Sequence, residues 1–347
     1  MLVARSGSNA PRDREPGEAR YPRVVTIRGT MVTPRDMGGR MQRVASDLLR
    51  LVVGDAVPRS VVREDGRIGP AVPFGRRVRL PGRGTTFVRE VAGPPGAPTL
   101  VLLHGFMASG GLNWFRTFDA LSREFHVVAP DLRGHARGIR SRRHMRLADC
   151  ADDVAALVGE LGTGKVIAAG YSMGGPVAQL LWRRHPDTVA GLVLCATAPE
   201  FSVGSQRVTD AYLASLAGLS RMVGHLAAVP AAGGNLLRKV RADRPAGFLE
   251  WAADEMRRHD VRMLTEAARS ITRFDSRDWL RDIDVPTSVL RTNRDRLVDP
   301  ARQTALVTSI PGAQLVEHDD GHLACGRSTF ATPLLGACQD IAWRANA

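Results

Sequence analysis

Residues 165–175 read KVIAAGYSMGG, and they carry the strongest structural signal in the sequence. Its first half is a short apolar run typical of a buried strand, and helical periodicity follows from Gly174 to His185. Glycines two positions before and two positions after Ser172 allow a sharp strand-to-helix turn. Such a turn raises the serine hydroxyl above the edge of a sheet, where a base can reach it. The stretch therefore predicts a strand, a tight turn and a helix, with Ser172 as a candidate nucleophile.

The alternation of strands and helices extends to both sides of this turn. Apolar runs begin at Thr99, His126, Val189, Thr287 and Ala313, and segments with helical periodicity separate them. Short apolar runs joined by helices are typical of buried parallel strands with right-handed crossovers. We therefore expect an α/β fold with a doubly wound, mostly parallel sheet formed by residues 76–198 and 284–347. The segments RRVRLP at 76–81 and TTFVREV at 85–91 begin this range and predict a β-hairpin at the sheet edge.

Two regions depart from this alternation. Between residues 199 and 283 the periodic segments are all helical, which predicts a helical cap inserted over the carboxyl edge of the sheet. Those helices are expected at residues 212–228, 247–258 and 261–271. Residues 1–75 form an N-terminal extension in this prediction. Its first 30 residues are expected either to be disordered or to precede the true start, for which Met31, Met37 and Met41 are candidates. Residues 37–53 are expected to form an amphipathic helix that packs on the following domain.

Composition limits the classes of function. The chain has 347 residues, of which 44% are apolar, as in a soluble globular protein. Its net charge of +13 comes from 48 basic and 35 acidic residues, and residues 1–95 contribute 18 Arg against 9 Asp or Glu, or +9. A nucleic-acid-binding arm remains an alternative, but aromatic residues are not regularly interleaved with these arginines, so we expect no nucleic-acid partner.

Cysteines and apolar runs predict the compartment. The four cysteines have no CxxC spacing, which favours reduced thiols. No stretch has the apolar length of a secretory signal or of a membrane span, so we expect a cytoplasmic protein without stable membrane insertion.

A serine nucleophile needs a base and a carboxylate that orients this base. Asp295 follows the predicted strand at 287–290, and His322 follows the predicted strand at 314–317. Because the carboxyl ends of parallel strands share one edge, both loops are expected to meet Ser172. The sequence thus predicts the catalytic set Ser172, Asp295 and His322.

Each partner has a rival. Asp299 precedes Pro300, where an N-terminal helix role is more natural, and Glu200 follows the strand that ends near residue 198. His318 is the rival base, although it lies at a strand end before the Asp-Asp-Gly turn. Loop position favours Asp295 and His322.

The oxyanion of an acyl-transfer intermediate needs fixed donors, usually two backbone N–H groups. One is expected to be that of Met173, the residue after the nucleophile. The other is expected to be that of Phe106 in the HGF loop after the strand at 99–103. His104 in this loop is interpreted as a buried structural histidine.

The substrate side has weaker signals. Trp114 and Phe115 follow the oxyanion loop and Tyr171 adjoins the nucleophile, so all three are candidates for substrate binding. Packing explains Trp114 and Phe115 equally well. The apolar composition of residues 212–228 favours an apolar cavity, which core packing also explains.

In this order, the motifs resemble those of the α/β-hydrolase fold superfamily over residues 76–345. The matching motifs are HGF at 104–106, PDLRGH at 130–135, GYSMGG at 170–175, RDRLVDP at 294–300 and DDGH at 319–322. Two departures concern loop geometry: Ala136 stands where many relatives have Gly, in Gly-His-Gly-x-Ser, and Gly321 stands where Asp is common.

The resemblance implies a serine esterase or lipase-like hydrolase that acts through an acyl-enzyme, without metal or other cofactor. The apolar residues of the predicted cap favour a small or medium apolar acyl ester as the substrate. Serine at the turn argues against the epoxide-hydrolase and dehalogenase branches. A thioesterase, lactonase, carbon-carbon hydrolase or cofactor-free perhydrolase remains open, as does a non-enzymatic small-molecule receptor. The oligomeric state does not follow from the sequence.

Overall fold

The computed structural model describes residues 60–62, 68–201 and 247–346. Its centre is an eight-stranded sheet in the order β10-β9-β8-β7-β5-β6-β4-β3. The strands are β3 Gly75–Leu80, β4 Gly84–Val91, β5 Thr99–Leu103, β6 His126–Pro130, β7 Val166–Tyr171, β8 Val189–Cys195, β9 Thr287–Thr292 and β10 Gln314–His318. Strands β5 to β10 pair in parallel, whereas β4 pairs antiparallel with β6. The predicted doubly wound, mostly parallel sheet is confirmed.

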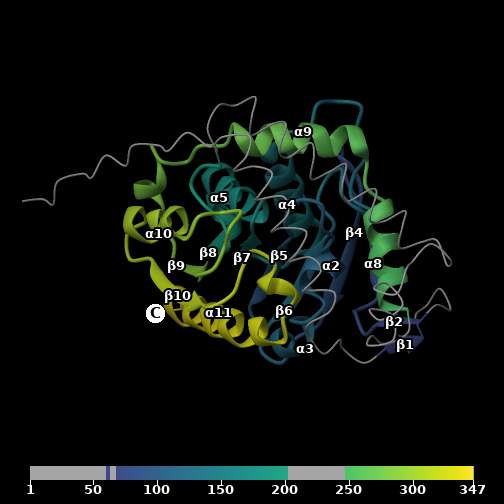
Figure 1. The fold of residues 1–347 in the computed structure, drawn as a ribbon, viewed down its shortest axis with the longest axis horizontal. Helices are drawn as coiled ribbons and strands as arrows, with labels where there is room; N and C mark the ends of the chain where they lie inside the picture. Colours follow the sequence, from purple (N-terminus) through teal and green to yellow (C-terminus); the bar gives the residue numbers. More distant parts are fainter. Residues whose placement is uncertain (1–59, 63–67, 202–246, 347) are drawn as a thin grey trace, which may run out of the picture. The chain divides into compact units, whose positions relative to one another are not determined.

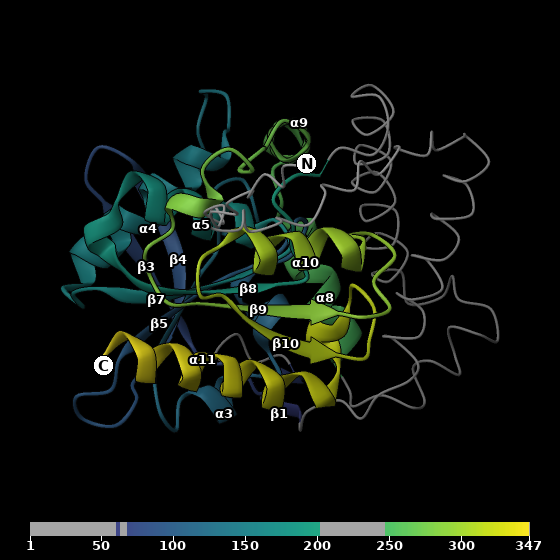
Figure 2. The same ribbon diagram turned by 90° about the vertical axis from the view of Figure 1, so that its left-hand side faces the viewer.

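Helices cover both faces of this sheet. The described α-helices are α2 Gly110–Trp114, α3 Phe118–Leu121, α4 Leu147–Leu161, α5 Gly174–Arg184, α8 Phe248–Arg257, α9 Val261–Thr272, α10 Pro300–Ser309 and α11 Ala331–Ala345. Figure 2 shows α4, α5 and α10 on one side of the sheet, and α3 and α11 on the other. Each side has its own apolar cluster, and the residues of β5 and β7 are fully buried between the two. Burial on both faces explains why these strands are continuous apolar runs.

The antiparallel edge of the sheet is the predicted hairpin. Strands β3 and β4 pair in register from Gly75 opposite Arg89 to Leu80 opposite Gly84. A second, two-stranded sheet pairs β1 Ser60–Val62 with β2 Ile68–Pro70. The hairpin prediction is therefore confirmed.

Three sequence predictions lie outside the described residues: the disordered start, the amphipathic helix at 37–53 and the helix at 212–228. Within the predicted cap range, α8 and α9 are helical as expected, and Figure 1 shows them as consecutive green helices. The division into extension, core and cap stays a prediction. Among the described helices, none is long and apolar enough to cross a membrane.

Candidate active site

Ser172 lies at the turn between β7 and α5, with a backbone φ of 51°. This left-handed conformation is costly for a residue with a side chain, and it persists where the surroundings determine it fully. The turn also needs its glycines, because a Cβ on Gly170 would lie 2.2 Å from the carbonyl oxygen of Gly174. A Cβ on Gly174 would lie 2.1 Å from the carbonyl oxygen of Leu103. The glycine spacing around Ser172 therefore has a steric cause.

His322 connects Ser172 with Asp295. Its Nε2 lies 2.9 Å from Ser172 Oγ, and its Nδ1 lies 2.8 Å from Asp295 Oδ2. Because a carboxylate only accepts hydrogen bonds, Nδ1 carries the ring proton and Nε2 accepts from the serine hydroxyl. The structure thus brings together the three side chains that sequence reasoning selected, in the geometry that a general base requires.

Asp295 is held from several directions. Its Oδ1 accepts the N–H groups of Leu297 and Val298, both at 2.9 Å. Its Oδ2 accepts the hydroxyl of Thr292 at 2.8 Å and the Gln303 amide at 3.2 Å, in addition to His322. The side chain is fully buried, so these bonds replace the water that a carboxylate would otherwise bind. These hydrogen bonds hold the Asp295 carboxylate in one orientation, and the carboxylate in turn orients the His322 imidazole.

Tyr171 holds the other end of His322. Its hydroxyl donates to the His322 carbonyl at 2.6 Å, and its ring packs against Trp114, Phe330 and the imidazole. Burial raises the pKa of this phenol well above its usual value, so the hydroxyl remains a donor. The structure therefore places Tyr171 in contact with the histidine loop.

The rival acids and base have other contacts. His318 packs against Phe330 with ring centroids 5.9 Å apart. Glu200 pairs with Arg302, and Asp299 caps α10 by accepting the Ala301 N–H at 2.8 Å. Among the hydrogen bonds, ion pairs and ring contacts between described residues, none joins one of these rivals to Ser172 or His322.

The loop after β5 presents the Phe106 amide in a fixed orientation. The carbonyl of Gly105 accepts from His104 Nδ1 at 2.8 Å and from the Ala108 N–H at 3.2 Å. Because a trans peptide is planar, fixing this carbonyl also fixes the N–H of Phe106 on the opposite side. A Cβ on Gly105 would lie 3.4 Å from Ser172 Cβ, so the loop runs beside the serine.

His104 is buried as interpreted from the sequence. Its Nε2 accepts the Leu132 N–H at 2.9 Å, so Nδ1 is the protonated nitrogen that donates to Gly105. Burial lowers the pKa of His104 to about 3. The ring is therefore neutral and joins the HGF loop to the turn after β6.

Met173 begins the turn into α5, where the first N–H groups of a helix have no partner within it. Among the described residues, neither the Met173 nor the Phe106 amide donates a hydrogen bond. The two N–H groups that the sequence predicts as oxyanion donors therefore have no acceptor among the described residues.

The substrate-binding candidates lie mainly in packed clusters. Trp114 is fully buried and contacts Tyr171 and Phe330. Phe115 packs with Phe248 and Trp251 of α8. These contacts favour a packing role for Trp114 and Phe115. A substrate-binding role for these two residues stays a prediction.

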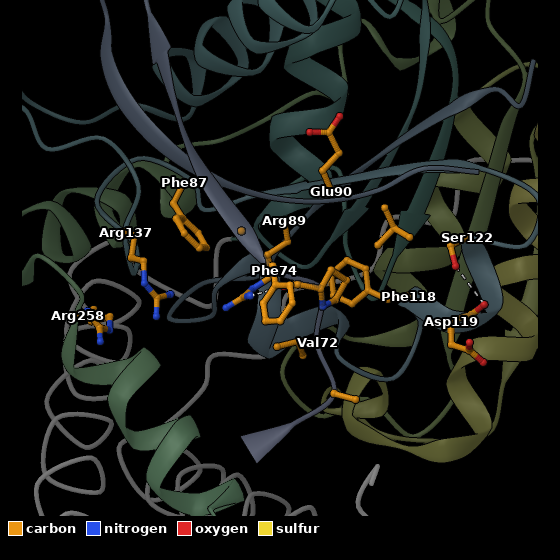
Figure 3. A pocket seen from close by; sticks show the side chains of 14 residues that line it. Val72, Phe74, Phe87, Arg89, Glu90, Phe118, Asp119, Ser122, Arg137 and Arg258 are labelled. Carbon is orange, nitrogen blue, oxygen red and sulfur yellow. Dashed lines mark hydrogen bonds between the residues drawn. The ribbon is translucent and has the colours of Figure 1, made fainter. Parts of the chain in front are cut away.

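A cavity of about 790 Å³ opens beside the antiparallel edge of the sheet (Figure 3). Phe74, Phe87 and Phe118 line it together with Arg89, Arg137 and other residues. None of its lining residues belongs to the hydrogen-bonded set around Ser172. In the part of the chain that the structure describes, no group of three or more His, Cys, Asp or Glu side chains is arranged to hold a metal ion.

Sequence reasoning missed the residues that hold Asp295. Thr292 ends β9 and Gln303 lies on α10, and both are fully buried polar residues. Gln303 is a polar residue on the apolar side of α10, and this position in the sequence indicates a polar group near it in the fold. Its partner could not be chosen without the packing of α10 against the acid loop.

The model of the alpha/beta hydrolase fold family matches residues 98–327. The pimeloyl-[acyl-carrier protein] methyl ester esterase of Aromatoleum aromaticum is 30% identical over 67% of this chain and 92% of that protein. The dihydrolipoyllysine-residue acetyltransferase component of the acetoin cleaving system of Pseudomonas putida is 39% identical over 31% of this chain, and the match spans only 29% of its length.

Solved structures also resemble this fold. The enol-lactonase of Burkholderia xenovorans LB400 superposes with a TM-score of 0.63 and 24% identity, over 77% of this chain and 100% of the lactonase. At this identity, the likeness supports the fold.

Proposed function

The chain belongs to the alpha/beta hydrolase fold family, and on this premise we propose that it is a serine hydrolase that cleaves a carboxylic ester or a related acyl bond. The observation that carries the proposal is the hydrogen-bonded chain from Ser172 Oγ through His322 to Asp295. A serine is a weak nucleophile until a base removes its proton, and the His322 imidazole is the proposed base. Ser172, His322 and Asp295 are the proposed catalytic triad.

In the first step, Ser172 Oγ attacks the substrate carbonyl while His322 Nε2 takes the hydroxyl proton. The C–O bond to the leaving alcohol then breaks, and the imidazolium returns the proton to that alcohol. Asp295 stabilises the imidazolium through Nδ1 without taking its proton. An acyl ester on Ser172 remains.

In the second step, water attacks the acyl-enzyme. His322 takes one proton from the water and returns it to Ser172 Oγ as the acid is released. In both steps, the N–H groups of Phe106 and Met173 are the proposed donors to the oxyanion. One such donor stabilises a transition state by roughly 3 kcal/mol.

The substrate proposed is a small or medium apolar acyl ester, and the cap proposed for residues 199–283 would cover it. The helices α8 and α9 support this cap. The methyl ester esterase among the relatives supports an ester, and its name gives no further substrate for this chain.

The test compares short and medium p-nitrophenyl esters with charged esters, acyl thioesters and lactones, in the full chain and in Ser172→Ala. We expect the highest kcat/KM for apolar oxygen esters and a loss of at least about 10³-fold in the variant. Equal rates in wild type and Ser172→Ala would refute the proposal. A preference for thioesters or lactones would keep the triad and replace the substrate class.

A further inference from the structure

His259 lies between α8 and α9 and binds two loops of the sheet core. Its Nδ1 accepts the N–H of Ala136 at 2.8 Å, in the turn after β6. Its Nε2 must then carry the ring proton, and it lies 3.1 Å from the carbonyl of Met107, in the loop that bears Phe106. One neutral imidazole thus joins the α8–α9 segment (Phe248–Thr272) to both loops.

Both partners of His259 have unusual backbones. Met107 has a φ of 57° and Ala136 a φ of 38°, although neither is glycine. Left-handed backbone at such residues costs roughly 1–2 kcal/mol and persists where surrounding contacts determine it. The imidazole supplies one of these contacts to each strained residue.

The contact at Met107 reaches the Phe106 amide through two peptide planes. The Met107–Ala108 peptide is held by His259 at its carbonyl, and at its N–H by the Gly105 carbonyl. The Gly105 carbonyl belongs to the same planar peptide as the N–H of Phe106. The orientation of one peptide therefore constrains the next, from His259 to the proposed oxyanion donor.

The same segment holds the far end of this loop. Glu255 on α8 is fully buried, and it accepts the hydroxyl of Ser109 at 2.6 Å. Ser109 in turn accepts the Leu112 N–H at the start of α2. An ion pair of 2.6 Å with Arg137 balances the charge of Glu255. Residues 107–109 are thus held at both ends by side chains of the α8–α9 segment.

We propose that His259 is a positioning residue for the oxyanion loop, acting through the Met107 carbonyl on the amide of Phe106. This proposal rests on the proposed function, because it assigns a purpose to a loop that would bind an oxyanion. It makes the α8–α9 segment part of the catalytic apparatus without any contact between His259 and substrate.

Two variants separate the two bonds of His259. In His259→Gln, the side-chain amide reaches the position of Nε2 and keeps a donor for Met107, while the acceptor for Ala136 is lost. In His259→Asn, the shorter side chain keeps an acceptor for Ala136 and loses the donor to Met107. The variants are therefore matched controls for each other.

We expect kcat on an apolar p-nitrophenyl ester to fall about 10- to 100-fold in His259→Asn, with KM within about twofold of wild type. His259→Gln should retain kcat within about threefold. Its Tm should nevertheless be the lower of the two, because the buried N–H of Ala136 loses its acceptor. A trifluoromethyl ketone forms a tetrahedral oxyanion on a reactive serine. Its affinity should fall with kcat/KM in His259→Asn only.

Equal kcat values in the two variants, or kcat values that follow Tm, would overturn the positioning role. The wild-type enzyme separates this failure from that of the proposed function. Active wild type with equal variants removes only the inference about His259. A wild type without Ser172-dependent turnover or ketone binding removes both.

Discussion

The two sides of the candidate site are held in place differently. On the acid side, Asp295 has four partners besides His322, and all lie between Thr292 and Gln303, at the end of β9 and the start of α10. On the oxyanion side, His104 joins the loop at 104–109 to Leu132 after β6, and Glu255 and His259 of the α8–α9 segment hold the same loop. The acid is therefore fixed by local sequence, whereas the oxyanion loop depends on a distant part of the chain.

This difference predicts two kinds of sensitivity. Losing a group on the acid side should disable the proton transfer itself. Altering contacts on the oxyanion side should give graded losses, because several bonds share the positioning of one loop.

Asp295→Asn should lower kcat by about 10⁴-fold, because an amide that donates to Nδ1 stabilises the wrong imidazole tautomer. Steady-state kinetics on a p-nitrophenyl ester measure this loss. Asp299→Asn is the matched control, since Asn caps a helix as well as Asp does and kcat should stay within about twofold. If Glu200→Gln caused the large loss instead, the acid would be misassigned.

Tyr171→Phe should lower kcat about tenfold with little change in KM. The change removes the hydroxyl that donates to the His322 carbonyl at 2.6 Å, and such a bond contributes roughly 1 kcal/mol. The same assay, with a thermal melt, checks it. An unchanged kcat with a lower Tm would restrict Tyr171 to packing.

The histidines beside the oxyanion loop should make stability depend on pH. Burial lowers the pKa of His104 to about 3, that of His259 to about 4 and that of His135 well below 6.5. The unfolded chain therefore binds more protons below pH 6.5, so the free energy of unfolding should fall as the pH decreases from 6.5 toward 4. At about pH 5 each of His104 and His259 should contribute a loss of roughly 2 kcal/mol.

Buried Asp131 opposes this trend in part, because burial and Glu255 raise its pKa to about 6. Urea unfolding at about pH 7.5 and about pH 5 measures the balance. The histidine contributions should dominate, and His259→Gln should flatten the dependence. A free energy of unfolding that rises toward pH 5 would contradict the neutral, buried state of these rings.

Ala136→Gly should leave the free energy of unfolding within about 0.5 kcal/mol of wild type. Relief of left-handed strain, about 1–2 kcal/mol, offsets the entropy that glycine adds to the unfolded chain, about 0.4–1 kcal/mol, and the loss of a buried methyl group, about 0.8 kcal/mol. Chemical denaturation measures the change. Ala156→Gly on α4 is the matched control and should lower stability by about 1 kcal/mol. A loss in both variants would show that the turn at Ala136 carries no strain.

Much of the fold and the candidate site followed from local patterns. Because the carboxyl ends of parallel strands share one edge, the loops that carry Ser172, Asp295 and His322 were predicted to meet there. The structure brings their side chains within hydrogen-bonding distance. The contacts of Gln303 and His259 could not be predicted, because each depends on how a helix packs against a loop far away in sequence. Ala136 was noted as a departure from a glycine pattern, but its positive φ required the structure.

Ser172 is the proposed nucleophile, and labelling with a fluorophosphonate tests this role without any assumption about the substrate. The labelled protein is digested, and mass spectrometry locates the adduct. We expect one adduct, on the peptide that contains Ser172, and none in Ser172→Ala. An adduct on another residue, or labelling that persists in the variant, would contradict it.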